Sequence, residues 1–429
     1  MRSIYFSSLT PLRGIAALLV VLFHCEIFVA PLMDKHLSLF VDKCWIWVDF
    51  FFVLSGFILT HVYGETFGEG VKRPAYWNYL RARFARVYPL HFFTLLWALA
   101  AGMLILAGPM KDAKWANLFH QIFDIRGFPA CVFLVQAMHL FPTPPMNTPS
   151  WSLSTEWWTY LLFPLMMPFL AASGGRMQRL LRLLGPGGRA QRLIWLLVIA
   201  GLYGFVRYRM AGRFGLPFSQ WQPATLNTNS DYAFPRCVAG FMLGMVTYRW
   251  YQLRAGQRLL QRDVLFWIIG LALVVSLHFD VNELLTVALF PVLILAAAYN
   301  GSAVRRLLST RPAQRLGDWS FSIYMVHMPV FFTYRAIAPL LGWWIPQGFY
   351  TVGTDYRLGW LCACIFLIVT VAMASLCYQW VEVPARNYLN GRRRAGFAAE
   401  KGAPAGKRVD GKRVDRKRVA GDGRREISK

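Results

Sequence analysis

The sequence predicts an all-α fold, a polytopic bundle of transmembrane helices, and three observations lead to this class. Hydrophobic residues make up 56% of the 429 residues. Charged residues make up 16%, whereas a soluble protein of this size carries about 25%. The apolar residues form long continuous runs rather than an alternating pattern, which argues against a β-barrel. This composition also excludes soluble, disordered, collagen-like and coiled-coil chains.

Apolar runs long enough for a membrane-spanning helix, which needs about 20 such residues, occur about ten times along the chain. The seventh and eighth runs are separated by a very short polar segment, a pattern typical of a helical hairpin. We therefore expect spans near residues 11–31, 44–63, 88–108, 151–172, 193–211, 232–250, 263–279, 283–300, 319–341 and 358–381.

Basic residues predict the orientation of these spans. The chain has 46 Lys and Arg against 21 Asp and Glu, a formal net charge of +25. Because these bases lie between the apolar runs and in the tail, we interpret them as a topology signal and not as a nucleic-acid-binding surface. If the N-terminus is cytoplasmic, the arginine-rich connections near 72–86, 176–192, 254–262 and 305–315 all face the cytoplasm. Both termini are therefore expected on that side, N-in and C-in.

The chain divides into a transmembrane domain, residues 1–390, and a basic tail, residues 391–429, which we expect to be disordered. The longest outer connection, 109–150, ends in a proline-rich stretch that cannot be regular helix. Within it, the segment from Phe119 to Leu140 is a candidate for an interfacial or re-entrant helix. The seven cysteines show no metal-ligand spacing, so neither a metal site nor a disulfide framework is expected. No cleavable signal peptide is expected either.

Ionisable residues inside a membrane-spanning run are candidates for function, because an unpaired charge in hydrocarbon is costly. In the first run, Arg13 and His24 are eleven positions apart, about 20° from whole helical turns. Both therefore lie on one helix face, about 16 Å apart along the axis. The competing interpretation is an Arg that reaches the membrane surface and a His with a purely structural role.

Three further sites carry polar groups at or near the membrane surface. Arg83 and Arg86 are helix neighbours at the predicted inner surface, and two adjacent guanidiniums there can bind a phosphate, although charge alone favours an ordinary topology signal. Asp49 near the outer end of the second run either faces a wet cavity or pairs with an arginine. The adjacent pair Ser55 and Gly56 is typical of close helix packing.

The fourth and ninth runs add the last candidate residues. Glu156 lies one to two turns into the fourth run and needs a partner, and His24 is expected at a similar depth. In the ninth run, Ser320, Tyr324 and His327 follow the spacing i, i+4 and i+7. They form one polar stripe on an apolar helix, and this stripe should face the interior of the bundle.

Taken together, these segments resemble the acyltransferase-3 family, the integral-membrane O-acyltransferases of bacterial surface polysaccharides. The ordered motifs that carry the resemblance cover the chain up to about residue 390. A mild departure is Phe321 after Ser320, where the family often has tyrosine, and no appended extracytoplasmic hydrolase domain is found. The matching segments are Arg13 to His24, Phe51 to Phe57, Arg83 to Arg86, Trp151 to Glu156, Ser320 to Pro329 and Glu382 to Arg386.

The resemblance implies transfer of an acyl group, with acetyl expected, from cytoplasmic acyl-CoA to a hydroxyl of an extracytoplasmic or lipid-linked polysaccharide. The location it implies is the bacterial inner membrane. The expected catalytic residues are His24 as general base and Glu156 as the group that orients it. The expected acyl-CoA-binding residues are Arg13, Arg83 and Arg86, and the expected substrate-binding residues are Asp49, Ser320, Tyr324 and His327.

The sequence leaves two other functions open. It also leaves open one alternative mechanism for acyl transfer. A secondary transporter or flippase also carries buried Arg, His and Glu, although no internal repeat is evident. A non-catalytic scaffold for polysaccharide assembly explains the hydrophobicity but not the polar stripe. Within acyl transfer, a transient acyl-histidine is the alternative to direct attack by the acceptor.

Overall fold

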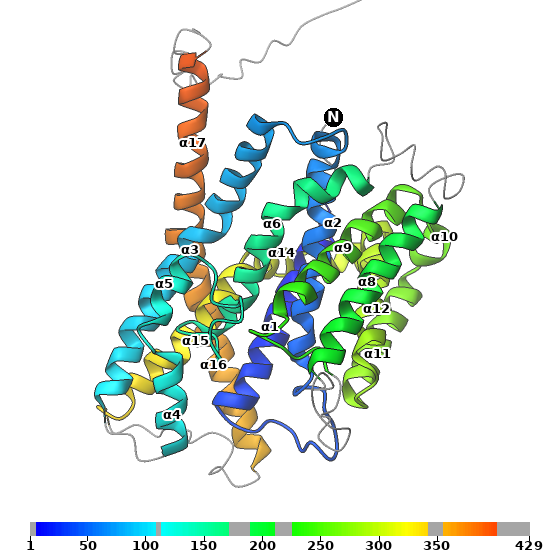
Figure 1. Ribbon diagram of the computed structural model, residues 1–429. Coiled ribbons are helices and arrows are strands. Elements are labelled where there is room, and N and C mark those ends of the chain that lie inside the picture. The colour runs from blue at the N-terminus through cyan, green and yellow to red at the C-terminus, as the bar shows by residue number, and fades with distance from the viewer. Residues whose placement is uncertain (1–5, 109–112, 171–188, 211–224, 342–354, 401–429) are drawn as a thin grey trace, which may run out of the picture.

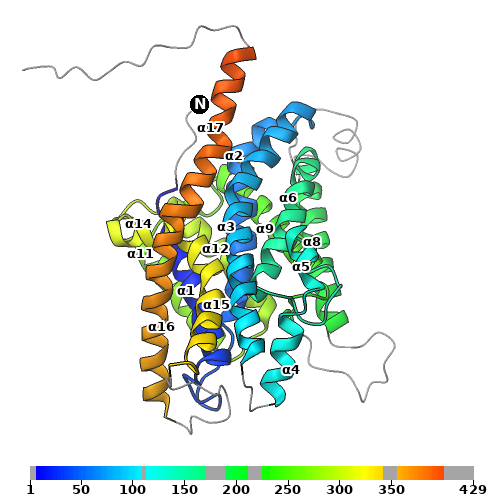
Figure 2. The same ribbon diagram turned by 90° about the vertical axis from the view of Figure 1, so that its left-hand side faces the viewer.

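The structure is a computed structural model that describes residues 6–108, 113–170, 189–210, 225–341 and 355–400. Within these residues the regular secondary structure is entirely helical, with no strand, which confirms the all-α class. The beginning of α1 and the far end of α17 lie at the same end of the bundle (Figure 1, Figure 2).

A helix is found at each of the ten predicted spans. By length and hydropathy alone, five helical segments among the described residues are long and apolar enough to cross a membrane, so the number of crossings and the N-in, C-in orientation stay predictions. The ten helices are α1 (Leu9–Phe28), α2 (Trp47–Phe67), α3 (Arg73–Ala107), α6 (Trp151–Leu170), α8 (Arg189–Met210), α9 (Ala233–Gln252), α11 (Asp263–His278), α12 (Glu283–Tyr299), α15 (Ser320–Ile337) and α16 (Tyr356–Cys377).

The outer surface of the bundle is apolar in the way that a membrane protein requires. On α11 and α16, large side chains such as Trp267, Leu271 and Ile368 are more than half exposed. Large apolar side chains exposed in this number are unfavourable in water and are suited to lipid. These apolar helices, with their exposed apolar faces, are typical of a multi-pass membrane protein.

Short helices connect the long ones: α4 (Ala113–Ile122), α5 (Gly127–Val132), α10 (Gln257–Leu260), α13 (Ala303–Leu308) and α14 (Arg311–Asp318). The expected single helix from Phe119 to Leu140 is wrong. The chain turns between α4 and α5, where Asp124 Oδ1 accepts a hydrogen bond from the Arg126 backbone N–H at 3.0 Å. Beyond α5 the backbone of Leu134 takes a positive φ of 56°, which a continuing helix does not allow.

The last helix, α17 (Val383–Glu400), continues past Gly391, where the sequence placed the start of the tail. Residues 401–429, which include the rest of that tail, lie outside the described residues. Between α16 and α17, a π-helical turn covers Tyr378–Glu382 and carries Glu382 to the interior of the bundle.

The closest helix packing joins α2 to α9. A Cβ atom added at Gly56 would overlap the Phe241 carbonyl oxygen, and one added at Gly244 would overlap the Val53 carbonyl oxygen. Only glycine allows the two backbones to approach this closely. The packing role predicted for Gly56 is therefore confirmed, and this contact fixes α2, which supplies one wall of the site.

Candidate functional site

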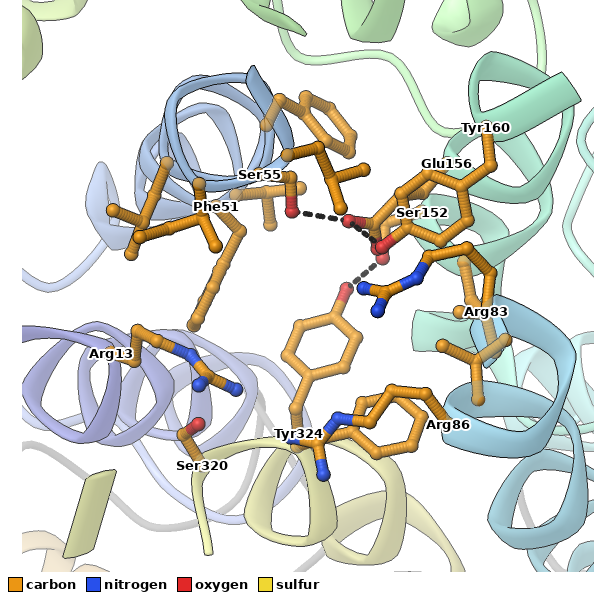
Figure 3. A pocket seen from close by; sticks show the side chains of 18 residues that line it. Arg13, Phe51, Ser55, Arg83, Arg86, Ser152, Glu156, Tyr160, Ser320 and Tyr324 are labelled. Carbon is orange, nitrogen blue, oxygen red and sulfur yellow. Dashed lines mark hydrogen bonds between the residues drawn. The ribbon is translucent and has the colours of Figure 1, made fainter. Parts of the chain in front are cut away.

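One cavity of about 180 Å³ lies among α1, α2, α3, α6 and α15, and we call it the arginine cavity (Figure 3). The structure brings all three predicted acyl-CoA-binding residues to this one space, although they come from two helices far apart in sequence. Its polar lining consists of Arg13, Ser55, Arg83, Arg86, Ser152, Glu156, Tyr160, Ser320 and Tyr324.

Two of these arginines keep hydrogen-bonding capacity for a ligand. Arg13 points toward the cavity beside Ser320 (Figure 3), and no described residue accepts a hydrogen bond from its guanidinium. Arg83 lies over the ring of Tyr63, 5.6 Å from its centroid, and its buried Nε has no partner among the described residues. Guanidinium groups of this kind are well suited to bind an anion.

Arg86 is held differently, because it forms an ion pair with Glu382. The other carboxylate oxygen of Glu382 accepts a hydrogen bond from Ser322 Oγ at 2.8 Å, and Arg386 lies 3.8 Å from the first oxygen. Arg86 therefore has a structural role in addition to lining the cavity, which the sequence did not reveal. The π-helical turn at Glu382 makes this contact, and such turns often occur at functional sites.

Glu156 lies on the wall of the arginine cavity. Its Oε1 accepts hydrogen bonds from Ser55 Oγ at 2.5 Å and from Tyr160 Oη at 2.6 Å (Figure 3). The role of orienting the His24 imidazole stays a prediction, and this geometry does not favour it: Oε1 binds both hydroxyls, and Glu156 lines this cavity and not the one that His24 lines. The side chain of Glu156 faces α2, whereas the prediction relied on depth in the membrane alone.

A second cavity, of about 260 Å³, contains His24 in its wall, and we call it the histidine cavity. His24 Nδ1 lies 2.9 Å from the Val20 carbonyl oxygen. Since a carbonyl oxygen can only accept, Nδ1 carries the proton and Nε2 presents a lone pair. The other polar or aromatic lining residues are Trp45, Thr143, Thr148, Trp151, Asn227, Asn229, Arg236 and Tyr324.

His327 packs against His24 and lines neither of these two cavities, so the substrate-binding role expected for it stays a prediction. The two ring centroids are 4.8 Å apart. His327 has no exposed surface, and neither of its ring nitrogens has a hydrogen-bond partner among the described residues. Its position therefore makes it a support for the ring of His24.

Asp49 lines neither of these two cavities, and its expected substrate-binding role stays a prediction. It is fully buried, and Arg236 Nη2 donates to its Oδ2 at 2.6 Å. The guanidinium of Arg236 also lies near the rings of Trp45 and Trp151, 5.0 and 5.4 Å from their centroids. The structure thus selects the pairing alternative for Asp49. Sequence reasoning did not identify Arg236 as this partner. The presence of an arginine inside the predicted sixth span was nevertheless a signal that it needs a buried acidic partner.

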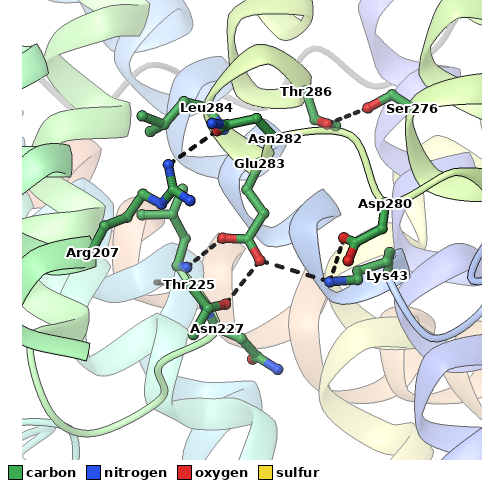
Figure 4. A network of polar contacts seen from close by, with 11 residues as sticks. Lys43, Arg207, Thr225, Asn227, Ser276, Asp280, Asn282, Glu283, Leu284 and Thr286 are labelled. Carbon is green, nitrogen blue, oxygen red and sulfur yellow. Dashed lines mark hydrogen bonds and ion pairs between the residues drawn. The ribbon is translucent and has the colours of Figure 1, made fainter. Parts of the chain in front are cut away.

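A polar network holds the segment that leads into the histidine cavity (Figure 4). Glu283 Oε1 accepts from Thr225 Oγ1 at 2.8 Å, and its Oε2 accepts from the Leu226 backbone N–H at 2.6 Å. Lys43 lies 2.6 Å from Asp280 and 3.9 Å from Glu283. These contacts fix the backbone immediately before Asn227, one of the residues in the cavity wall.

Tyr324 is the residue of the polar stripe that contacts both cavities. Its hydroxyl donates to the Pro149 carbonyl oxygen at 2.9 Å and lies 2.8 Å from Ser152 Oγ. Ser320 lines only the arginine cavity and not the histidine cavity. Its buried Oγ has no hydrogen-bond partner among the described residues. The predicted stripe thus faces the interior at Ser320 and Tyr324. The described residues contain no cluster of His, Cys, Asp or Glu that could hold a metal ion.

Comparison with known proteins defines the class to which this site belongs. A family model described as an acyltransferase domain matches residues 6–379. The chain therefore belongs to the acyltransferase-3 family, as its motifs indicated.

Two relatives are similar to the chain, and the name of the first agrees with this assignment. The chain is 28% identical to acyltransferase MdmB of Streptomyces mycarofaciens over 426 residues, which cover 92% of this chain and 94% of the relative. It is 34% identical to protein 2 in the picA locus of Rhizobium radiobacter over 160 residues, 35% of this chain and 76% of that relative. No solved structure matches the chain.

Proposed function

We propose that this protein is an O-acyltransferase of the bacterial inner membrane. It moves an acyl group, with acetyl expected, from cytoplasmic acyl-CoA to a hydroxyl of an extracytoplasmic or lipid-linked polysaccharide. The observation that carries the proposal is the placement of three arginines in one cavity and His24 in the next, with Tyr324 in the wall of both.

The donor binds in the arginine cavity. Its volume of about 180 Å³ is below the range of about 300–1,000 Å³ typical of pockets that enclose a whole small molecule. It therefore takes the acyl group and part of the pantetheine arm, while the nucleotide lies toward the beginning of α3. Arg13 and Arg83 bind phosphate or carbonyl oxygens through charge-assisted hydrogen bonds. Glu156 accepts an amide N–H of the arm, which replaces the role first expected for it.

The acceptor binds in the histidine cavity. Trp45 and Trp151 contribute aromatic surface to the wall beside the Arg236 guanidinium, and Asn227 and Asn229 supply amide donors and acceptors for the hydroxyls of a sugar. A pocket with aromatic walls and a small number of polar groups is suited to hold a sugar in a defined orientation.

His24 acts as the general base. Its Nε2 lone pair takes the proton of the acceptor hydroxyl while the hydroxyl oxygen attacks the thioester carbonyl carbon. The tetrahedral intermediate then collapses, the carbon–sulfur bond breaks, and CoA leaves as a thiol after it receives the proton. In the alternative course, Nε2 itself attacks the thioester and the acceptor then removes the acyl group from the imidazole.

The competing function is a transporter or flippase of the polysaccharide pathway. A direct assay separates the two: the purified protein in lipid is incubated with radiolabelled acetyl-CoA and a polysaccharide extract from the source cells. The acyltransferase forms a labelled ester that mild base removes. A transporter moves the glycan across sealed vesicles and forms no ester, which would contradict the proposal.

A further inference from the structure

The arginine cavity and the histidine cavity lie next to each other and share part of their lining. Of the residues that line them, Val48 and Tyr324 are the two that line both. Val48 is small, so the phenol ring of Tyr324 supplies most of this wall. Figure 3 shows the ring at the edge of the arginine cavity, with its hydroxyl directed toward Ser152.

The turn before α6 holds this ring in place. The Tyr324 hydroxyl is bound to Pro149 and Ser152, and Asn147 Nδ2 donates to the Met325 carbonyl oxygen at 2.8 Å. The turn is thus attached to α15 at two consecutive residues. Pro149 also lines the histidine cavity, so the group that holds the ring belongs to the wall of the second cavity.

A wall between the cavities that is closed at this position would have a chemical consequence. A thioester in the arginine cavity is protected from water and small nucleophiles in the histidine cavity. The same wall blocks the acyl group from His24, so the ring has to turn before transfer takes place. Movements of single side chains and loops commonly control such steps.

We propose that Tyr324 is a movable partition between the two cavities, closed by its hydrogen bonds to Pro149 and Ser152. Its effect on acyl transfer rests on the proposed function, whereas the partition itself is a property of the two cavities and is tested without any substrate. The first experiment therefore measures access, and the second measures catalysis.

The access experiment uses single cysteine reporters on the two sides of the wall. Ile58→Cys lies in the arginine cavity and Thr143→Cys in the histidine cavity, and both wild-type side chains are partly exposed. Sealed vesicles are treated with a membrane-impermeant sulfonated thiosulfonate on the side from which Thr143→Cys reacts. Mass spectrometry of the individual peptides separates the reporters from the native cysteines.

With Tyr324 present, we expect Ile58→Cys to react far more slowly than Thr143→Cys. Tyr324→Ala should remove most of this difference. Tyr324→Phe keeps the ring but loses the hydroxyl contacts. In this background the labelling rate of Ile58→Cys should rise about five- to thirty-fold, the effect of one to two hydrogen bonds. The Thr143→Cys rate in each background confirms that the protein is folded. Rapid labelling of Ile58→Cys with Tyr324 intact, or no increase in both variants, overturns the partition.

The catalytic experiment measures hydrolysis of acetyl-CoA without acceptor. Tyr324→Ala should raise hydrolysis relative to transfer, because water from the histidine cavity reaches the thioester. Val48→Ala is the matched control, since it alters the same wall without touching the hydroxyl contacts, and it should have the smaller effect. If the labelling result holds but no variant acts on acetyl-CoA, the partition stands and the proposed function fails.

Discussion

The imidazole rings of His24 and His327 lie 4.8 Å apart, and they join α1 to α15 beside the histidine cavity. His24 is partly exposed to this cavity, whereas His327 is fully buried behind it. Together with the Val20 carbonyl oxygen, His327 restricts the orientation of the His24 ring. Such support is what a general base needs in order to meet its substrate in one geometry.

His327 therefore supports the ring of His24 through the shape of its own ring, by packing against it. His327→Phe keeps a flat ring against His24 and should retain most transfer activity. His327→Ala leaves a space and should lower the turnover number about ten-fold or more, because a small misplacement of a catalytic group has effects of this size. Steady-state kinetics of ester formation, at matched protein concentration, measures both. An inactive Phe variant with normal acetyl-CoA binding would instead give His327 a role in proton transfer.

Substitutions of the three cavity arginines, Arg13, Arg83 and Arg86, should have two different kinds of effect. Arg13→Ala and Arg83→Ala should weaken acetyl-CoA binding by about ten-fold each, the loss of one charge-assisted hydrogen bond, with no change in the amount of folded protein. Lys at position 83 should restore binding only in part, since it lacks the planar geometry of guanidinium. Binding is measured by equilibrium titration of detergent-purified protein.

Arg86→Ala should behave differently, because it leaves the Glu382 carboxylate without its main partner in the interior. We expect less folded protein as well as weaker binding. The double variant Arg86→Ala with Glu382→Gln should restore the protein level but not acetyl-CoA binding. Full binding by the double variant would show that Arg86 serves structure alone.

The Asp49–Arg236 pair should be essential for stability. Removing one member leaves the other as an unpaired buried charge, at a cost of about 3–5 kcal/mol. Asp49→Ala and Arg236→Ala should therefore lower the thermal unfolding temperature sharply. The double variant Asp49→Asn with Arg236→Gln should be less harmful than either, because no uncompensated charge remains. Unfolding temperatures that are equal in all three variants would argue against the pair as the source of stability.

The orientation of the chain is testable independently of the site. Reporter enzymes fused after Gly391 and within the 141–149 segment should be active on opposite sides of the membrane, with Gly391 on the cytoplasmic side. A fusion at Gly391 that is active only outside the cytoplasm contradicts the N-in, C-in arrangement.

Helical periodicity predicted much of this site from the sequence. Arg13 and His24 lie on the face of α1 that meets the cavities, and Arg83 and Arg86 share one face of α3, because both predictions depend only on spacing along a regular helix. The polar stripe of α15 likewise faces the interior at Ser320 and Tyr324.

Pairings between distant helices were not predictable in the same way. Glu156 was assigned to His24 from its estimated depth, but depth does not specify the face, and the carboxylate points to Ser55 and Tyr160. The contact of Arg86 with Glu382 depends on a π-helical turn, which has no clear sequence signal. The Asp49–Arg236 pair depends on the position of α2 beside α9, which tertiary packing determines.

The central claim is that His24 removes the proton from the acceptor hydroxyl, and substitution by glutamine tests it most directly. His24→Gln keeps similar volume and hydrogen bonding but cannot take a proton at the position of Nε2. We predict that ester formation falls by at least about 10²–10⁴-fold, the typical contribution of a general base. Protein level and acetyl-CoA binding, measured in parallel, should be unchanged. If His24→Gln retained substantial transfer activity, His24 would be a structural residue and the account of catalysis would be wrong.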